Sequence, residues 1–365
     1  MKDRDIIKYL IIAEYYPNSG VGTYLNNLTN YLSKKSKVIT IVNIQSKMTS
    51  GIFFDGFYLN RPSIFRRVFY KFPISLIYDL YVLLPLIFKH RPTHVIVSVA
   101  SNVNFLGVFF FSRNITFVNH SVIKNENKGF FKVRHFINLF LSSKKKIIAV
   151  SEFQKSNILQ YWVETRNKNY ITVIHNACIE KISNASKTNS TIRIITCANL
   201  VSYKNPMIWI KVAANVISKS KINIVFEWYG DGPLFSICEE LVDDHLKSRI
   251  IFKRAISDLS DKYSSSHIYL HTSEQETHGL SIIEAMSFSL PCVAFDVGGI
   301  KESIINNNYG FLVKYGDVDE MVKILLMLIN DENLRNEIGK NAYSYFKSKF
   351  SIPVWEKNMD KFFEK

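Results

Sequence analysis

Two glutamates placed on either side of a glycine are the residues of this sequence best suited to chemistry. Glu276 and Glu284 are eight residues apart, which on one continuous helix would set them about 80° apart around the axis. Gly279 permits a tight turn between them, and the helix that follows runs from about Leu280 until Pro291 ends it. The pattern therefore predicts a loop that carries Glu276 and a helix that carries Glu284.

The predicted helix start at Leu280 indicates what such a site could bind. Unpaired amide groups and the helix dipole favour an anion at a helix N-terminus behind a glycine loop. Carboxylates accept hydrogen bonds from neighbouring hydroxyl groups. The stretch is thus typical of a pocket for a phosphate beside a polyol, although a solvated helix with two surface glutamates also fits the pattern.

Two further candidates come from the first half of the chain. Gly20 lies between an apolar run at 6–13 and a helix with an apolar stripe, in a loop that lacks the third glycine of the dinucleotide fingerprint. It either lets the loop approach a ligand or serves as an ordinary turn residue. His120 follows the strand-like run 114–118, where a lone histidine is also compatible with a purely structural role.

The elements that position these residues alternate between strands and helices. Such alternation predicts parallel sheets covered on both faces, with ligands at the carboxyl ends of the strands. A polar, weakly patterned stretch at 179–190 interrupts the rhythm and marks the expected domain boundary. Strands are predicted at 6–13, 38–43, 94–99, 114–118, 146–150, 171–175, 191–197, 222–229, 249–253, 267–271 and 292–296, and the helices of the second half at 206–219, 233–245, 280–289 and 300–306.

The charge of the chain is concentrated in its first half. Residues 1–180 contain 24 Lys and Arg against 9 Asp and Glu, whereas residues 181–365 contain 22 of each. This asymmetry favours an anionic partner such as a phosphate-bearing substrate, an anionic membrane or nucleic acid, although a basic surface can also serve solubility alone. No nucleic-acid-binding module is recognisable, so nucleic acid is not expected as a partner. The four cysteines form no close pair, which favours a reducing compartment.

One stretch departs from the alternation. Residues 58–91 combine basic and aromatic side chains with an apolar run, 75–88, that contains Asp79 and Pro85. The run is shorter than the roughly 20 residues a membrane span needs, so we interpret it as a buried helix. The basic and aromatic part before it could instead rest on an anionic membrane surface.

With the whole chain in view, its motifs resemble those of the retaining family 4 glycosyltransferases, whose Glu-x7-Glu motif matches Glu276 and Glu284. The resemblance covers nearly the full length. It implies an α/β fold of the GT-B architecture, with two Rossmann-like doubly wound domains that face a cleft: residues 1–180, residues 181–345, and a C-terminal helix at 346–365 that packs back on the first domain. The matching residues, in order, are Gly20, His120, 151–153, Asn176, 199–200, Lys204, 230–233, Ser273, Glu276, 279–280, Glu284, Ala285, Pro291 and 298–299.

The resemblance also assigns roles to residues of the second domain. It implies that Glu276 binds the hydroxyls of a donor sugar and that Glu284 binds the ribose of its nucleotide. Lys204 and the backbone amides from His278 through Gly279 to Leu280 would contact the diphosphate. Carboxylates for hydroxyls, and amides with a cation for phosphate, are chemically matched pairs.

In the first domain, the resemblance implies that His120 lies against the donor sugar near the reacting carbon and that Gly20 lets its loop approach the diphosphate. The expected catalytic residues are therefore Glu276, His120 and Lys204. Two positions depart from the family pattern. Asn199 stands where the family usually has an arginine that helps neutralise the leaving diphosphate, for which Arg254 could substitute, and Ile179 stands where an aspartate is common.

The implied function is transfer of a sugar from a nucleoside-diphosphate sugar to a hydroxyl of a glycan or lipid-pyrophosphate-linked acceptor, with retention of configuration. We expect no metal or other cofactor, a cytoplasmic location at the inner face of the plasma membrane, a peripheral contact through the basic first domain, and a role in bacterial surface polysaccharide biosynthesis. A nucleotide-sugar epimerase of the same architecture, or a catalytically weak partner subunit, is the alternative.

Overall fold

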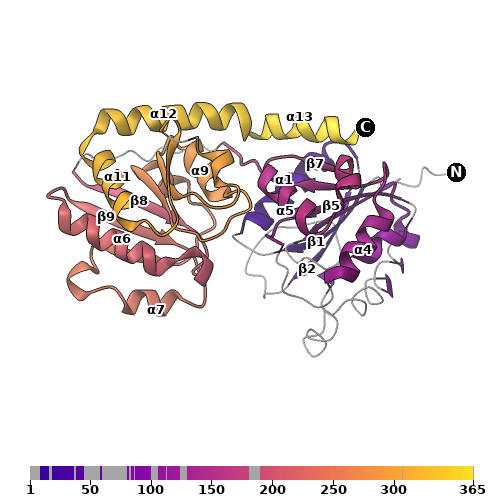
Figure 1. Cartoon of the computed structure of the whole chain (residues 1–365), viewed down its shortest axis with the longest axis horizontal. Helices are drawn as coiled ribbons and strands as arrows, with labels where there is room; N and C mark the ends of the chain where they lie inside the picture. Colours follow the sequence, from indigo (N-terminus) through magenta and orange to yellow (C-terminus); the bar gives the residue numbers. More distant parts are fainter. Residues whose placement is uncertain are drawn as a thin grey trace. The chain divides into compact units, whose positions relative to one another are not determined.

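The chain divides into two compact units, one of Met1–His175 with Asn358–Lys365 and one of Asn176–Lys357. This architecture comes from a computed structural model (Figure 1), in which the seven-stranded sheet belongs to the first unit and the six-stranded sheet to the second. The residues that the structure describes are 9–15, 19–36, 38–44, 58–59, 80–81, 84–85, 87–99, 106–111, 113–123, 130–180, 190–305 and 307–364.

The first unit is built on a parallel sheet of strand order β3-β2-β1-β4-β5-β6-β7. The order reverses between β1 and β4, which places the carboxyl ends of these two strands beside each other. The strands are β1 (Tyr9–Tyr15), β2 (Val38–Ile44), β3 (Tyr58–Leu59), β4 (His94–Val99), β5 (Asn114–Asn119), β6 (Lys145–Ala149) and β7 (Ile171–Val173).

An amphipathic helix packs on a sheet through its apolar stripe. In α1 (Gly20–Ser33) the predicted stripe of Tyr24, Leu25, Leu28, Tyr31 and Leu32 is buried, which confirms that prediction. Further helical segments of the unit with described bounds are α4 (Phe130–Phe140), α5 (Glu152–Tyr161) and the 3-10 turns η2 (Leu106–Phe110) and η3 (Thr165–Tyr170).

The end of the chain packs on the first unit. Tyr31 donates a hydrogen bond to Asp360 over 2.7 Å, and the ring of Phe363 lies 5.7 Å from that of Tyr9 and 5.0 Å from that of His94. The expected single helix at 346–365 is instead two, since α12 (Glu332–Lys349) ends before Phe350 and α13 (Ile352–Phe363) begins after Ser351.

The break between these helices has a local cause, which also decides where the second unit begins. The N–H group of Cys178 donates to the carbonyl of Phe350 over 3.2 Å, and Cys178 pairs with Ser351 as an isolated parallel bridge. The backbone of Phe350 and Ser351 therefore pairs with Cys178 at the point where α12 ends. Because this pairing ties Cys178 to the second unit, the division falls between His175 and Asn176, before the expected boundary at 179–190.

The second unit is built on a parallel sheet of strand order β10-β9-β8-β11-β12-β13, which reverses between β8 and β11. Like the first sheet, it is of the doubly wound Rossmann type predicted from the alternation. The strands are β8 (Ile192–Cys197), β9 (Ile224–Tyr229), β10 (Ile250–Lys253), β11 (Ile268–His271), β12 (Cys292–Phe295) and β13 (Gly310–Val313).

Helices bury both faces of the second sheet. One core joins the sheet to α6 and α11 through Trp209, Val212, Leu325 and Leu328, and the other joins it to α9 and α12 through residues such as Phe346. Figure 1 shows α6 and α9 on opposite faces of this sheet. The helical segments are α6 (Pro206–Lys219), α7 (Phe235–Glu240), α8 (Ser260–Ser264), α9 (Leu280–Ser287), α10 (Ile300–Ser303), α11 (Val318–Asn330) and the 3-10 turns η4 (Ser202–Lys204) and η5 (Asp244–Leu246), with α12 as given above.

Further predictions of secondary structure were wrong in part. The helix predicted at 233–245 stops at Glu240, since the following residues form the 3-10 turn η5. In the run interpreted as a buried helix, Ile87 is buried, but Tyr81 and Phe88 are 79% and 71% exposed. A helix buried on all sides therefore does not fit those residues, and most of 58–91 lies outside the described part of the chain.

Candidate active site

The loops after β8 and β11 meet at the carboxyl edge of the second sheet because these strands are neighbours at the point where the strand order reverses. Thr272 donates from Oγ1 to the carbonyls of Lys204 and Asn205, over 3.1 and 3.3 Å. The N–H group of Glu274 donates to the carbonyl of Tyr203 over 2.8 Å. These bonds fix the loop of Lys204 against the loop of Glu276.

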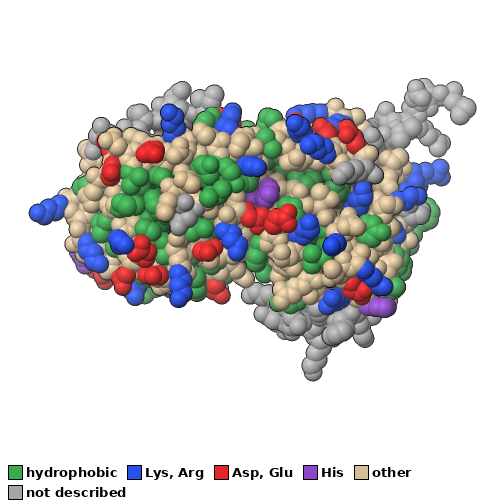
Figure 2. All heavy atoms as spheres, turned by 45° about the horizontal axis from the view of Figure 1, so that its top comes forward, with side chains coloured by type: hydrophobic (Ala, Val, Ile, Leu, Met, Phe, Trp, Pro, Cys, Tyr) green, Lys and Arg blue, Asp and Glu red, His purple; other side chains and the backbone are tan. Residues whose placement is uncertain are grey.

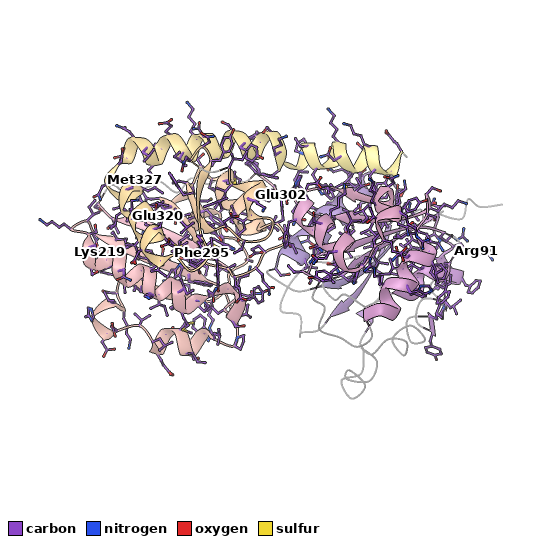
Figure 3. All side chains as sticks on the ribbon, in the orientation of Figure 1. Arg91, Lys219, Phe295, Glu302, Glu320 and Met327 are labelled. Carbon is purple, nitrogen blue, oxygen red and sulfur yellow. The ribbon has the colours of Figure 1, made fainter. Side chains whose placement is uncertain are left out.

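A second contact secures the same loop from the segment that follows β13. Asn205 has a left-handed backbone with φ of 52°, and its side-chain amide donates to the hydroxyl of Tyr315 over 3.1 Å. The ring of Tyr315 lies 5.3 Å from that of Phe295, the last residue of β12, which is labelled in Figure 3. The loop that carries Lys204 is thus held both by the loop after β11 and by Tyr315, which follows β13 (Gly310–Val313).

The carboxylate of Glu276 is the centre of this edge. Its Oε1 accepts a hydrogen bond from the ammonium group of Lys204 and from the hydroxyl of Ser273, the latter over 3.2 Å. Nε2 of His271 lies 3.0 Å from the same oxygen. The side chains of Lys204 and Glu276 are 15% and 13% exposed, so the pair is largely withdrawn from solvent while part of it stays accessible.

The pKa values of Glu276 and His271 follow from this arrangement. Burial by itself would raise the pKa of the Glu276 carboxyl, but the charge of Lys204 and the hydrogen bond with His271 outweigh it, and the net pKa lies well below the usual value. Burial lowers the pKa of His271, which the neighbouring carboxylate only partly opposes. At neutral pH the site therefore holds an ionised carboxylate beside a neutral imidazole.

The backbone of Glu276 is held by the glycine pair after β12. Gly298 has a φ of +56°, and a Cβ atom built on it would lie 1.9 Å from the carbonyl oxygen of Glu276. The N–H group of Gly299 donates to that same oxygen over 3.1 Å. Only glycine fits such an approach, so Gly298 determines the path of the Glu276 loop.

The start of α9 has the form predicted for it. Gly279 precedes the helix with a left-handed φ of 77°, and its carbonyl accepts from Ile282 over 3.0 Å. The ring of His278 is buried and lies 5.3 Å from Phe350, while its carbonyl accepts from Ser303 over 3.2 Å. The ring is thus part of the core, and His278 can meet an anion only through its backbone, as can Leu280 at the first helical position.

Glu284 lies on the second turn of α9 and is half-buried. The hydroxyl of Tyr263 donates to its Oε2 over 3.3 Å. The structure thus brings Glu284, Glu276, Lys204 and the start of α9 to one edge of the second sheet. This is the loop-and-helix arrangement predicted from the glycine between the two glutamates.

Asn199 follows β8 and is exposed. Arg254, the residue considered as its substitute, follows β10 at the same edge, where its guanidinium lies 3.3 Å from Asp231 and 3.6 Å from the ring centre of Phe235. The carbonyl of Asp231 in turn accepts from the N–H group of Leu200 over 2.8 Å. Arg254 therefore joins the backbone beside Asn199 through Asp231 and makes no described side-chain contact with Asn199 itself.

In the first unit, His120 follows β5 and is packed tightly. Its Nε2 lies 2.9 Å from Oγ of Ser98, and its ring lies 4.7 Å from that of Tyr24. Burial lowers the pKa of His120 to about 4, so the imidazole is neutral at pH 7.

Gly20 is the first residue of α1, after the N-cap Ser19, whose hydroxyl accepts from Gly22 over 3.2 Å. Its helical backbone does not itself require a glycine.

His271 is the site residue that sequence reasoning missed. It ends a predicted buried strand, and a polar residue at the carboxyl end of such a strand is the signal that could have found it. Ser273 was noted only as part of a motif, and the structure places it on Glu276. Among the described residues, no three His, Cys, Asp or Glu side chains are arranged to hold a metal ion.

The chain has an α/β fold of the GT-B type, and comparison with known proteins shows which family its second unit resembles. Residues 179–345 match the family model for glycosyl transferases group 1. Like HepE from Anabaena, solved in complex with UDP, it has the GT-B fold: the TM-score is 0.74 at 16% identity, over 98% of this chain and 100% of that one.

Two relatives show how far the sequence similarity extends. The chain is 32% identical over 132 residues to N-acetyl-alpha-D-glucosaminyl L-malate synthase from Bacillus anthracis, over 35% of each protein. It is 29% identical over 238 residues to poly(ribitol-phosphate) alpha-N-acetylglucosaminyltransferase from Staphylococcus aureus, over 64% of this chain and 47% of that one. The matches thus span between about a third and a half of these relatives' lengths.

Proposed function

We propose that the protein is a glycosyltransferase that moves a sugar from a nucleoside-diphosphate sugar to a hydroxyl of a glycan or lipid-linked glycan acceptor, with retention of anomeric configuration. The observation that carries the proposal is the arrangement around Glu276. An ionised carboxylate, a lysine and a helix N-terminus behind a glycine lie at one edge of the sheet, where doubly wound folds bind ligands.

Each group suits one part of such a donor. In this proposal Glu276 accepts hydrogen bonds from the sugar hydroxyls, and Glu284 accepts from the ribose. Lys204 and the amides at the start of α9 stabilise the charge that develops on the leaving diphosphate. Gly20 and His120 of the first unit serve the diphosphate and the sugar, respectively.

The reaction needs no nucleophile from the protein. In the proposed step, the bond between the anomeric carbon and the diphosphate breaks, and the acceptor oxygen bonds to that carbon on the same face. The leaving phosphate takes the acceptor's proton, so atoms and charge balance without a separate base. We propose that no metal takes part, since Lys204 and the helix dipole meet the charge of the leaving group.

The relatives support a proposal for the donor and the pathway. The S. aureus relative is named as an N-acetylglucosaminyltransferase that acts on poly(ribitol-phosphate), and HepE was solved in complex with UDP. These descriptions support a UDP-sugar donor and an acceptor in bacterial surface polysaccharide synthesis.

Turnover of labelled UDP-, GDP- and ADP-sugars with and without lipid-pyrophosphate-linked glycans tests the proposal. We expect release of the nucleoside diphosphate that depends on the acceptor, and NMR of the product should show the anomeric configuration of the donor. Conversion of the donor without an acceptor would indicate an epimerase instead. A product of inverted configuration would contradict the retaining mechanism, and no turnover of any donor would favour a non-catalytic partner.

We further propose that the first unit rests on the inner face of the plasma membrane. Phe110 and Leu139 are 48% and 64% exposed, and the ring of Phe110 packs 5.2 Å from that of Phe140. The ammonium group of Lys145 lies 5.1 Å from the ring centre of Phe140. An exposed apolar surface beside lysines is the composition that anionic interfaces attract.

The wider surface of the first unit bears on this second proposal. Figure 2 shows further Lys and Arg side chains on the first unit. In the described part of the chain, no helix is long and apolar enough to cross a bilayer. Flotation with anionic liposomes at moderate salt should carry the wild type upward, whereas a Leu139→Glu variant should float less. Equal recovery of both would contradict this surface, and no flotation of the wild type would contradict the membrane contact.

A further inference from the structure

A histidine that no part of the proposed reaction uses lies directly against the central carboxylate. His271 is the last residue of β11, and its side chain is only 1% exposed. Its Nε2 lies 3.0 Å from Oε1 of Glu276. A buried imidazole at this distance from a carboxylate is within hydrogen-bonding range.

The three partners of the Glu276 carboxylate all meet the same oxygen. Lys204, His271 and Ser273 contact Oε1. Among the residues that the structure describes, none makes a hydrogen bond with Oε2. A carboxylate fixed through one oxygen cannot rotate freely, and its second oxygen keeps its full capacity to accept.

His271 is itself fixed from behind. Its Nδ1 lies 3.4 Å from the hydroxyl of Tyr269, and the two rings are stacked at 23°. The hydroxyl of Tyr269 donates over 2.8 Å to Oγ of Ser281, in the first turn of α9. A line of contacts therefore joins the start of α9 to Glu276 through β11.

The protonation of His271 agrees with a donor role. Burial lowers the pKa of its imidazole, so the ring is neutral at pH 7 and carries a single N–H group. Placed on Nε2, this proton faces the ionised Oε1 of Glu276. Placed on Nδ1, it would leave a nitrogen lone pair against the carboxylate, which is repulsive.

We propose that His271 is a positioning residue, whose Nε2–H donates to Oε1 of Glu276 and thereby directs Oε2 toward the hydroxyls of the donor sugar. This inference rests on the proposed function. In that function Lys204 contacts the diphosphate through a long, flexible side chain, so it is a poor fixed support for the carboxylate. The short, buried side chain of His271 supplies that support in both the free and the bound protein.

Measuring the binding of UDP, UDP-glucose and UDP-N-acetylglucosamine distinguishes loss of Glu276 positioning from a general disruption of the site. Loss of a hydrogen bond to a charged group should weaken binding of the UDP-sugars about tenfold in His271→Leu. Binding of UDP should not change, since Glu276 contacts only the sugar. His271→Gln, whose side-chain amide can take the place of Nε2–H, should restore sugar binding.

His267→Leu is the matched control. His267 lies just before the other end of β11 and is also buried, where its Nδ1 accepts from the N–H group of Arg193 over 3.1 Å. This variant should bind UDP and the UDP-sugars with the same affinities as the wild type. If His271→Leu weakened the binding of UDP as strongly as that of the UDP-sugars, or changed neither affinity, the positioning of Glu276 by His271 would be refuted.

A measurement without ligand keeps the inference apart from the proposed function. The ¹⁵N NMR spectrum of histidine-labelled wild type, assigned with His271→Gln, should show the Nε2–H tautomer for His271 at pH 7.5. The Nδ1–H tautomer would overturn the inference. If the wild type bound no nucleotide while His271 held the Nε2–H tautomer, the proposed function would fail and the hydrogen bond would stand.

Discussion

His120 should make the stability of the first unit depend on pH. Its imidazole is buried against Tyr24 and Ser98, and its pKa falls from the ordinary 6.5 to about 4. In the unfolded chain the same ring takes up a proton below pH 6.5. Between these two values the unfolded state therefore binds more protons than the folded state, and acid favours unfolding.

The size of the effect follows from these two pKa values. At pH 7 the ring is mostly neutral in both states, so the contribution is close to zero. At pH 5 the unfolded ring is almost fully protonated and the folded ring is not, which costs about 2 kcal/mol of unfolding free energy. Below the folded value, near pH 4, both states are protonated and the loss stops growing.

The variant His120→Gln isolates this contribution, because an amide still hydrogen-bonds with Ser98 but does not titrate. Urea unfolding should be followed through a fluorine-labelled Trp162, which lies in the core of the first unit. Between pH 7 and pH 5 the free energy of unfolding of the wild type should fall by about 2 kcal/mol more than that of the variant. An equal loss in both proteins would refute the burial of a neutral His120.

Three further changes test the second unit. Gly298→Ala should destabilise it by about 1–3 kcal/mol and weaken donor binding, as seen by urea unfolding and calorimetry, because the new methyl group meets the backbone of Glu276; an unchanged midpoint would contradict the close approach. Lys204→Met should raise the pKa of Glu276, so that donor binding fails at a higher pH than in the wild type, and a binding profile that does not shift would refute their coupling. Asn199→Arg should lower the KM for the donor several-fold, because an arginine supplies the cation that the family pattern has at this position. It should change the free energy of unfolding by less than about 0.5 kcal/mol, because position 199 is exposed; an unchanged KM would place the missing cation elsewhere.

Much of the fold could be predicted because local chemistry determines it. Helix α6 matches the prediction of 206–219 at both ends, since Pro206 suits the first helical position and Trp209, Val212 and Val216 form the apolar stripe. Strand β4 likewise matches 94–99. The strand β13 and the helix α11 were not predicted. A helix-start signal was nevertheless present, since Asp317 caps α11 by accepting from the N–H group of Glu320.

The site could be predicted only in part, because the sequence does not show which strands are neighbours in the sheet. Glu276, Gly279 and Glu284 are close along the chain, so their loop and helix followed from the glycine. Lys204 reaches Glu276 only because β8 and β11 are neighbours. The same holds for Gly298, which supports the Glu276 backbone from the loop after β12.

Transfer from labelled UDP-sugars by Glu276→Ala and its matched control Glu274→Ala tests the central claim most directly. Glu274 is an exposed carboxylate in the same loop, so its loss removes the same charge without touching the proposed site. The account predicts that Glu274→Ala transfers sugar like the wild type, whereas Glu276→Ala loses transfer by at least about a hundredfold. Undiminished transfer by folded Glu276→Ala would contradict the assignment of this carboxylate to the donor sugar.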